Sequence, residues 1–274
     1  MPQMNRDLAA RLGLETVEII REGAYTAPSG QRVDLSRALE SCRSGTIEYP
    51  PDHDVPQPRA AAADTIISVE NATTLEMGRR LAARDERTAA LNFASATHPG
   101  GGFLGGARAQ EESLARSSGL YAALDGREMY APHRRSADAR YTDWVIYSPD
   151  VPVFRNDAGE LLEEPWTMAI VTCAAVNGYA LAEHAPERMR EIPAVMQKRT
   201  ARVLAVAAEH RVRRLVLGAW GCGAFGLDAP MMAGIFKEAL FGPFKGVFEE
   251  IVFAITDWSP AQRTIEPFRR AFEP

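Results

Sequence analysis

Residues 99–112 read PGGGFLGGARAQEE, a glycine-rich stretch that decides how the rest of this 274-residue chain is interpreted. Five of the seven residues at positions 100–106 are glycine. Glycine adds no side chain to a core and loses more backbone entropy on folding than other residues, so such a cluster brings the backbone close to something. An apolar run, residues 89–94, precedes it, and helix-forming residues follow it at 110–116. The expected order is therefore a strand, a glycine loop and a helix whose first turn carries Glu111 and Glu112.

A second glycine cluster, GCGAFG at residues 221–226, lies between a short strand expected at residues 215–217 and a helix expected from residue 229. It fits the pattern G-x-G-x-x-G, in which backbone amides and a helix N-terminus hold a diphosphate. A dinucleotide-binding Rossmann domain is excluded, because that fold needs the motif near its start and only 48 residues follow Gly226. A tight turn between strand and helix is the plainer alternative.

From residue 60 onward the chain alternates between strand-like and helix-like segments. Strands are expected at residues 65–69, 88–93, 144–147, 151–154, 168–172, 215–217 and 251–255, and helices at residues 72–84, 187–211, 229–241 and 260–272. This rhythm is typical of a three-layer α/β domain whose mixed central sheet is flanked by helices. Both glycine loops follow strands, so we expect them at the carboxyl edge of the sheet, where open α/β folds bind ligands.

Residues 1–59 are expected to form an N-terminal helical extension and a proline-rich linker. Apolar residues recur at helical spacing over residues 5–23 and 34–42, with Asp34 as a candidate N-cap. Four prolines within residues 50–58 exclude a helix there. We therefore divide the chain into this extension and a main domain of residues 60–274.

The composition is that of a globular protein, with 46% apolar and 24% charged residues. A net charge of −5 argues against direct nucleic-acid binding, which normally uses a basic face. An anionic ligand would instead be held by oriented backbone N–H groups of the two glycine loops. The basic stretches at residues 127–140 and 188–214 either steer a polyanion towards this cleft or form solvated helix faces.

The three cysteines are odd in number, lack CxxC spacing and follow no apolar signal segment, so we expect a reducing, cytoplasmic location. No window approaches the ~20 apolar residues of a membrane span, and a soluble protein without membrane contact is expected. The histidines show no metal-ligand spacing, so no metal or cofactor is predicted. Cys222 is expected to be a small packing residue, with a nucleophilic role as the alternative.

Three short motifs carry a resemblance to a known family. They are NFASA at residues 92–96, GGG at residues 100–102 and, seven residues later, QEE at residues 110–112. Together they resemble the signature of bacterial-type poly(ADP-ribose) glycohydrolases, which have the macrodomain fold. Residues 148–155 and 221–226 are similar more loosely. The resemblance implies a macrodomain that binds ADP-ribose, cleaves the ribose–ribose O-glycosidic bond of poly(ADP-ribose) and acts in the DNA damage response.

The resemblance also implies roles for individual residues. Glu112 matches the catalytic glutamate and Glu111 its substrate-positioning neighbour. The substrate-binding residues would be Gly100, Gly101 and Gly102 against the scissile ribose, Gln110, and Gly221, Gly223, Ala224, Phe225 and Gly226 around the diphosphate, with Phe225 against the ribose. His98 departs from the family pattern, which has Asn at this position, and its effect on ribose contacts is left open.

The spacing of the two glutamates constrains the mechanism independently of the family. Consecutive helical residues point about 100° apart, so Glu111 and Glu112 cannot both face one anomeric carbon. A glycosidase with acids on opposite sides of the bond is therefore excluded. We expect Glu112 to act first as general acid and then as general base, with Glu111 holding ribose hydroxyls and its charge helping to keep a proton on Glu112. The plainer alternative is that both acids only complement the helix dipole.

Several alternatives stay open at this point. The first is a non-hydrolysing ADP-ribose-binding module, which would not need the glutamate pair. The second is a mono(ADP-ribosyl) hydrolase acting on a protein or nucleobase linkage. The expected substrate is poly(ADP-ribose) or ADP-ribosylated proteins, and the expected state is a monomer. These motifs do not fix the preference for polymer or mono-ADP-ribose, cleavage at chain ends or within chains, or the oligomeric state. Candidates for stacking on adenine are Phe268, Trp258 and Tyr179, although aromatic residues of this kind are more often core residues. Glu70 is a candidate acceptor for the adenine amino group.

Overall fold

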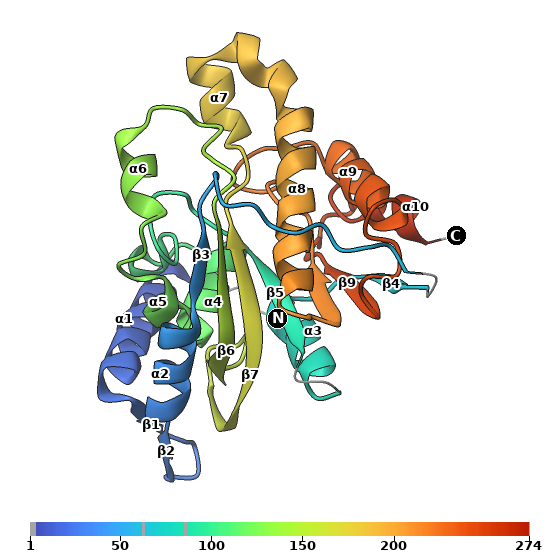
Figure 1. Ribbon diagram of the computed structural model, residues 1–274. Coiled ribbons are helices and arrows are strands. Elements are labelled where there is room, and N and C mark those ends of the chain that lie inside the picture. Colours follow the sequence, from blue (N-terminus) through green and yellow to red (C-terminus); the bar gives the residue numbers. More distant parts are fainter. Residues whose placement is uncertain (1–3, 62–63, 85–86, 274) are drawn as a thin grey trace.

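The computed structural model describes residues 4–61, 64–84 and 87–273, and its centre is a seven-stranded sheet with the strand order β3-β6-β7-β5-β8-β9-β4 (Figure 1). The strands are β1 Ala24–Thr26, β2 Arg32–Asp34, β3 Ile47–Tyr49, β4 Ile66–Glu70, β5 Thr88–Phe93, β6 Val145–Arg155, β7 Leu161–Cys173, β8 Arg214–Leu217 and β9 Glu250–Ala254. The helices are α1 Arg6–Glu22, α2 Ser36–Gly45, α3 Thr74–Ala82, η1 Phe103–Gly105, α4 Gln110–Ser117, α5 Leu120–Leu124, α6 Tyr130–Arg135, α7 Gly178–His184, η2 Pro186–Glu191, α8 Ile192–Glu209, α9 Ala229–Phe241 and α10 Glu266–Phe272.

The sheet is mixed, as expected. Strands β4, β9, β8, β5 and β7 form a parallel block, and β6 and β3 extend it beyond β7 with antiparallel pairing. Because β5 and β8 are parallel and adjacent, the glycine loops that follow them leave the same edge of the sheet. The predicted proximity of the two loops is thus a consequence of the strand order.

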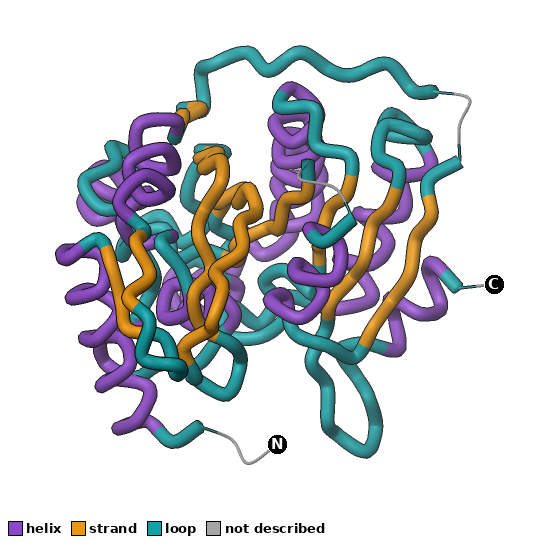
Figure 2. Tube along the Cα trace, turned by 90° about the horizontal axis from the view of Figure 1, so that it is seen from below, coloured by secondary structure: helices purple, strands orange, loops and turns teal. Residues whose placement is uncertain are grey.

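Helices cover both faces of the sheet, which gives three layers (Figure 2). Strand residues alternate between the two cores: Leu215 and Leu217 of β8 point to one face, and Val216 points to the other. The first core contains residues of α8, α9 and α10, and the second contains residues of α3, α4 and α5. The predicted three-layer α/β class is confirmed.

The N-terminal extension contains the two expected helices, α1 and α2. The prediction of Asp34 as the N-cap is wrong by one residue, because the N-cap of α2 is Leu35; the Asp34 Oδ1 still accepts a hydrogen bond from the Ser36 N–H at 2.7 Å. The short strands β1, β2 and β3 were not predicted, and β3 pairs with β6 as an edge strand of the central sheet. Residues 50–61 contain neither helix nor strand, as their prolines require. The division of the chain at residue 59 stays a prediction.

Three element predictions are corrected by the structure. The helix expected at residues 187–211 is split into η2 and α8, because Pro193 lacks the N–H that a continuous helix needs and lies in the first turn of α8. The two strands expected at residues 144–147 and 151–154 are one strand, β6, with a register shift at Asp150. The closing helix begins only at Glu266. None of the described helices is long and apolar enough to cross a membrane.

Candidate active site

The first glycine loop runs from the end of β5 to the start of α4. Gly100 and Gly101 have φ values of +72° and +62°, a backbone conformation that favours glycine. A Cβ atom on Gly101 would lie 3.0 Å from Oε2 of Glu111 and would also collide with the Glu112 carboxyl group. The loop backbone therefore passes directly against both carboxyl groups, and a side chain at Gly101 would push them apart.

Glu112 is 9% exposed and has one fixed and one free oxygen. The Gly102 N–H donates a hydrogen bond to its Oε1 at 2.9 Å. Its Oε2 is buried and accepts no hydrogen bond from any described residue. The glycine loop thus orients this carboxyl group while leaving one oxygen available to a ligand.

Glu111 is only 3% exposed, and both of its oxygens are bonded to the protein. The Ser95 N–H donates to Oε2 at 2.6 Å, and the Asn92 Nδ2 donates to Oε1 at 3.2 Å. Burial raises the pKa of Glu111 to about 8, although the hydrogen bonds from Ser95 and Asn92 oppose the shift. That a charge on Glu111 helps to keep a proton on Glu112 stays a prediction.

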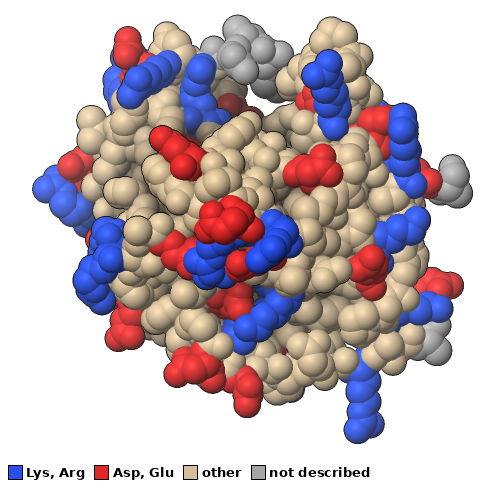
Figure 3. Space-filling model, turned by 90° about the horizontal axis from the view of Figure 1, so that it is seen from above, with Lys and Arg blue, Asp and Glu red and all other residues tan. Residues whose placement is uncertain are grey.

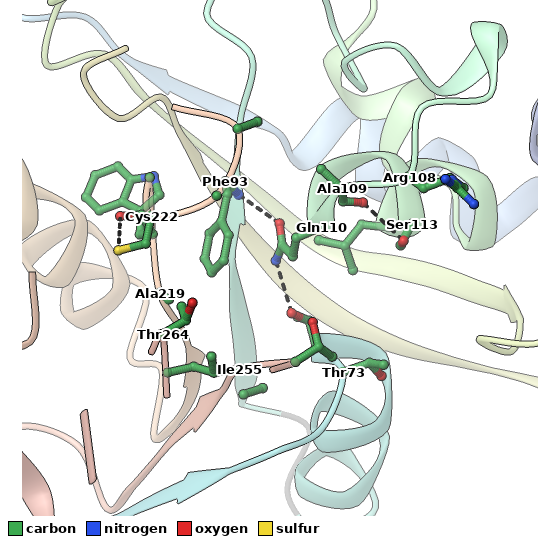
Figure 4. A pocket seen from close by; sticks show the side chains of 18 of the residues that line it. Thr73, Phe93, Arg108, Ala109, Gln110, Ser113, Ala219, Cys222, Ile255 and Thr264 are labelled. Carbon is green, nitrogen blue, oxygen red and sulfur yellow. Dashed lines mark hydrogen bonds between the residues drawn. The ribbon is translucent and has the colours of Figure 1, made fainter. Parts of the chain in front are cut away.

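Gln110 fixes the start of α4 relative to the sheet. Its Oε1 accepts from the Phe93 N–H at 2.9 Å, and its Nε2 donates to the Leu91 carbonyl at 2.8 Å and to Thr74 Oγ1 at 3.1 Å. Figure 4 shows this side chain pointing towards Phe93 and lining the pocket. Its contacts are structural, and its role in substrate binding stays a prediction.

The second glycine loop follows β8 and is closed by its own hydrogen bonds. Gly221 and Gly226 have φ values of +78° and +67°, and the Gly226 N–H donates to the Gly223 carbonyl at 3.0 Å. Within the described residues, no group accepts a hydrogen bond from the N–H groups of Gly223, Ala224 or Phe225. Three consecutive unpaired amides of this kind can bind an anion.

A cavity of about 400 Å³ lies between α3, α4, the second glycine loop and the end of β9 (Figure 4). The predicted residues that line it are Gln110, Gly221, Gly223, Ala224 and Phe225. The predicted residues Gly100, Gly101, Gly102, Glu111, Glu112 and Gly226 are not part of its wall. Gln110 and Ser113, which flank the two glutamates in α4, do line it, so the glutamates lie next to the cavity rather than in its centre.

Some predicted ligand contacts are corrected. Phe268 is fully buried against Phe253, with ring centroids 5.3 Å apart, and is a core residue that cannot stack on a ligand. Trp258 is 79% exposed, and neither it nor Tyr179 lines the cavity. Burial raises the pKa of Cys222 to about 12, which keeps the thiol protonated and supports its interpretation as a packing residue.

Two other features of the sequence have clear positions in the structure. His98 is exposed, its Nδ1 lies 2.9 Å from Thr97 Oγ1, and its side chain does not line the cavity. Glu70 forms an ion pair with Arg80 at 3.5 Å.

Several arginines of the two basic stretches are paired with acids. Arg140 and Arg188 both contact Asp138 and Glu191, and Arg199 is buried against Asp143 at 3.2 Å. Figure 3 shows basic and acidic side chains interspersed on the end of the molecule that carries α7 and η2. These residues therefore favour the interpretation as ion-paired surface over a field that steers a polyanion.

Sequence reasoning missed Asp157 and Thr73 in the cavity wall. The Thr73 O–H donates to Asp157 Oδ2 at 2.7 Å, and burial raises the pKa of Asp157. Asp157 lies in the turn between β6 and β7, and nothing in its local sequence indicates that this turn reaches α3. Within the described part of the chain, no group of three His, Cys, Asp or Glu side chains could hold a metal ion.

The comparisons place these features in a known family. The family described as microbial-type PARG, catalytic domain, matches residues 14–156, more than half of the chain. No curated protein matches the chain.

Solved structures of poly(ADP-ribose) glycohydrolase (PARG) are similar over nearly the whole chain. The enzyme from Thermomonospora curvata is 46% identical over 97% of this chain and 100% of its own, with a TM-score of 0.91. The same enzyme bound to the inhibitor ADP-HPD is 45% identical over the same shares, with a TM-score of 0.89. The enzyme from Deinococcus radiodurans in complex with ADP-ribose is 44% identical over 86% of this chain and 97% of its own, with a TM-score of 0.82. This chain therefore belongs to the microbial-type poly(ADP-ribose) glycohydrolase family.

Proposed function

We infer that this chain is a hydrolase that cleaves the ribose–ribose O-glycosidic bonds of poly(ADP-ribose) and releases ADP-ribose. Its family and its 46% identity to a solved PARG support this activity. The observation that carries the mechanism is the carboxyl group of Glu112, with Oε1 held by the Gly102 N–H and Oε2 buried without a partner among the described residues. A carboxyl group fixed in this way can donate a proton to a group placed against its second oxygen, and can later take a proton back.

The second glycine loop is proposed to hold the diphosphate of the substrate. The unpaired N–H groups of Gly223, Ala224 and Phe225 support this, because they offer several donors without a cationic side chain. Gly221 and Gly226 would shape the loop, and Phe225 would contact the ribose. The ADP-ribose complex of the Deinococcus enzyme supports a ligand of this class.

Hydrolysis needs two proton transfers through Glu112. The protonated carboxyl group donates its proton to the departing ribose oxygen, the bond from the anomeric carbon to that oxygen breaks, and an oxocarbenium-like centre forms. The Glu112 carboxylate then takes a proton from water, whose oxygen bonds to the anomeric carbon. The glycosidic bond is replaced by two hydroxyl groups, and Glu112 is protonated again.

Glu111 is proposed to position the substrate rather than to react. The two side chains leave the helix about 100° apart, and the glycine loop brings both carboxyl groups close to Gly101. The Ser95 N–H and the Asn92 Nδ2 fix the Glu111 carboxyl group, and the remaining lone pairs of its oxygens can accept from ribose hydroxyls. Gly100, Gly101 and Gly102 would allow the ribose to approach both glutamates.

We further propose that the chain acts as a monomer in the cytoplasm, on free polymer or on ADP-ribosylated proteins, during the DNA damage response. The net charge of −5 supports the absence of direct nucleic-acid binding. Poly(ADP-ribose) is then the substrate and ADP-ribose the product, with no cofactor.

Incubation with two substrates tests the proposed activity. The protein is mixed with labelled poly(ADP-ribose) and, separately, with a singly ADP-ribosylated protein, and free ADP-ribose is measured by chromatography. We expect multiple turnovers on the polymer. Binding of ADP-ribose without release from either substrate would contradict the proposal in favour of a binding module. Release from the singly modified protein alone would contradict it in favour of a mono(ADP-ribosyl) hydrolase.

A further inference from the structure

Helix α1 of the N-terminal extension packs directly on the glycine loop that orients Glu112. The Arg6 Nε donates to the Gly105 carbonyl at 3.0 Å, and the Arg108 Nη1 donates to the Met4 carbonyl at 2.5 Å. The two segments are about 100 residues apart in the sequence, and none of the family-derived site residues lies in α1. Helix α1 and the residue Met4 just before it are therefore tied by hydrogen bonds to the glycine loop.

Two glycines allow the backbone of α1 to lie directly against the backbone of the glycine loop. A Cβ atom on Gly13 of α1 would lie 2.7 Å from the Phe103 carbonyl oxygen. A Cβ atom on Gly106 of the loop would collide with the Arg6 carbonyl oxygen and lie 3.1 Å from the Arg6 carbonyl carbon. Real Cβ atoms do not approach a carbonyl oxygen this closely, so any side chain at Gly13 must move the loop or the helix.

The same helix also holds the other end of α4. The Thr16 O–H donates to the Arg116 carbonyl at 2.5 Å, and both residues are buried. The Arg155 guanidinium donates to the same carbonyl at 3.3 Å and pairs with Glu15 of α1 at 3.3 Å. Helix α1 thus contacts both the glycine loop and the helix that carries Glu112.

We propose that α1 is a positioning element of the active site, which sets the Gly102 N–H against the Glu112 carboxyl group through Gly13 and Thr16. Gly102 directly precedes Phe103, which Gly13 contacts, and Glu112 lies one helical turn before Arg116, which Thr16 holds. The inference rests on the proposed role of Glu112 in hydrolysis. Gly13 and Thr16 do not line the large cavity, so they should affect turnover and leave ADP-ribose affinity unchanged.

The Gly13→Ala variant tests this coupling. Alanine is a better helix former than glycine, so this change should stabilise the protein unless the contact with Phe103 opposes it. The matched control is Gly234→Ala in α9, a helical glycine with no atom within 4 Å of the added methyl group. Thr16→Val removes the hydroxyl group at similar volume, and Thr16→Ser keeps it and should restore turnover.

The measurements are kcat on poly(ADP-ribose), the Kd of ADP-ribose and the melting temperature of each variant. We expect kcat to fall about 10- to 100-fold in Gly13→Ala and Thr16→Val, as small displacements of a catalytic group do, with Kd within about twofold of wild type. Gly234→Ala and Thr16→Ser should keep near wild-type kcat. If Gly13→Ala does not fold, the comparison of Thr16→Val with Thr16→Ser tests by itself whether α1 positions Glu112.

Two results would overturn the inference. If folded Gly13→Ala and Thr16→Val keep the wild-type kcat, α1 does not set the geometry of Glu112. If these variants lose kcat and ADP-ribose affinity to the same extent, the contact does not act on Glu112 specifically. The wild-type protein in the same assay tests the proposed function separately. A wild type that binds ADP-ribose but releases none from the polymer contradicts the proposed hydrolysis and, with it, the role of α1.

Discussion

Glu111 and Glu112 are neighbours in one helical turn, yet the protein treats them differently. Glu111 accepts hydrogen bonds on both oxygens and has its pKa raised to about 8 by burial, whereas Glu112 keeps one oxygen without a partner among the described residues. The helical period alone predicts that the two side chains have different roles. Their protonation could not be predicted, since it depends on burial under a loop whose path is not visible in the sequence.

The raised pKa of Glu111 predicts a pH-dependent stability. Between its unfolded value of 4.5 and its folded value of about 8, the folded state binds more protons than the unfolded state. The contribution of Glu111 to the free energy of unfolding is therefore fully present below pH 4.5 and is lost as the pH rises towards 8. It is on the order of a few kcal/mol in total. Glu111→Gln should flatten the fall in unfolding free energy between pH 5 and pH 8, measured by urea denaturation.

The matched control for this measurement is Glu183→Gln, because Glu183 is an exposed glutamate on α7. It should keep the wild-type slope. An identical pH dependence in Glu111→Gln and wild type would show that Glu111 titrates normally.

Gly101 should tolerate no side chain, for two separable reasons. Its positive φ costs any other residue about 1–2 kcal/mol, and the added methyl group would press on both glutamates. Gly126→Ala is the control, because Gly126 has a φ of +78° with no atom within 4 Å. We expect Gly126→Ala to lose only the backbone cost and to keep full turnover, whereas Gly101→Ala loses more stability and at least about 10-fold in kcat. Equal behaviour of the two variants would argue against the contact.

At the scale of elements, the second glycine loop depends on its packing against α7. The Gly178 N–H donates to the Phe225 carbonyl at 2.8 Å, and a Cβ atom on Gly226 would lie 2.6 Å from the ring of Tyr179. The pattern G-x-G-x-x-G predicted a strand-to-helix loop with free amides. It could not predict α7, whose contact comes from a segment more than 40 residues earlier in the chain.

Gly226→Ala should therefore distort the proposed diphosphate site. We expect the Kd of ADP-ribose, measured by calorimetry, to rise by about 10-fold or more as the three free amides lose their alignment. Adding Tyr179→Ala removes the steric conflict and should recover part of the affinity, while the strain of the positive φ stays. Gly30→Ala, at another positive-φ glycine with open space, should bind like wild type. Unchanged affinity in Gly226→Ala would contradict the placement of the diphosphate.

At the scale of the whole molecule, the central strands and the order of the layers could be predicted because apolar runs such as residues 88–93 carry a strong signal. Strand β3 could not be predicted, because its three residues show no periodicity and pair only with β6 at the edge of the sheet. Asp157 was missed for a similar reason, because the lengths of β6 and β7 decide where their turn lies. The packing of α1 on the glycine loop is likewise a long-range contact.

The most direct test of the account is the turnover of Glu112→Gln on poly(ADP-ribose), measured beside its affinity for ADP-ribose and with Glu183→Gln as control. Glutamine keeps the shape of the side chain and a hydrogen-bond acceptor for the Gly102 N–H, but it cannot transfer a proton. If Glu112 carries both proton transfers, kcat falls by about 10³-fold or more, the Kd of ADP-ribose stays within about threefold of wild type, and the control is fully active. A Glu112→Gln variant that retained more than about a tenth of wild-type kcat would contradict it.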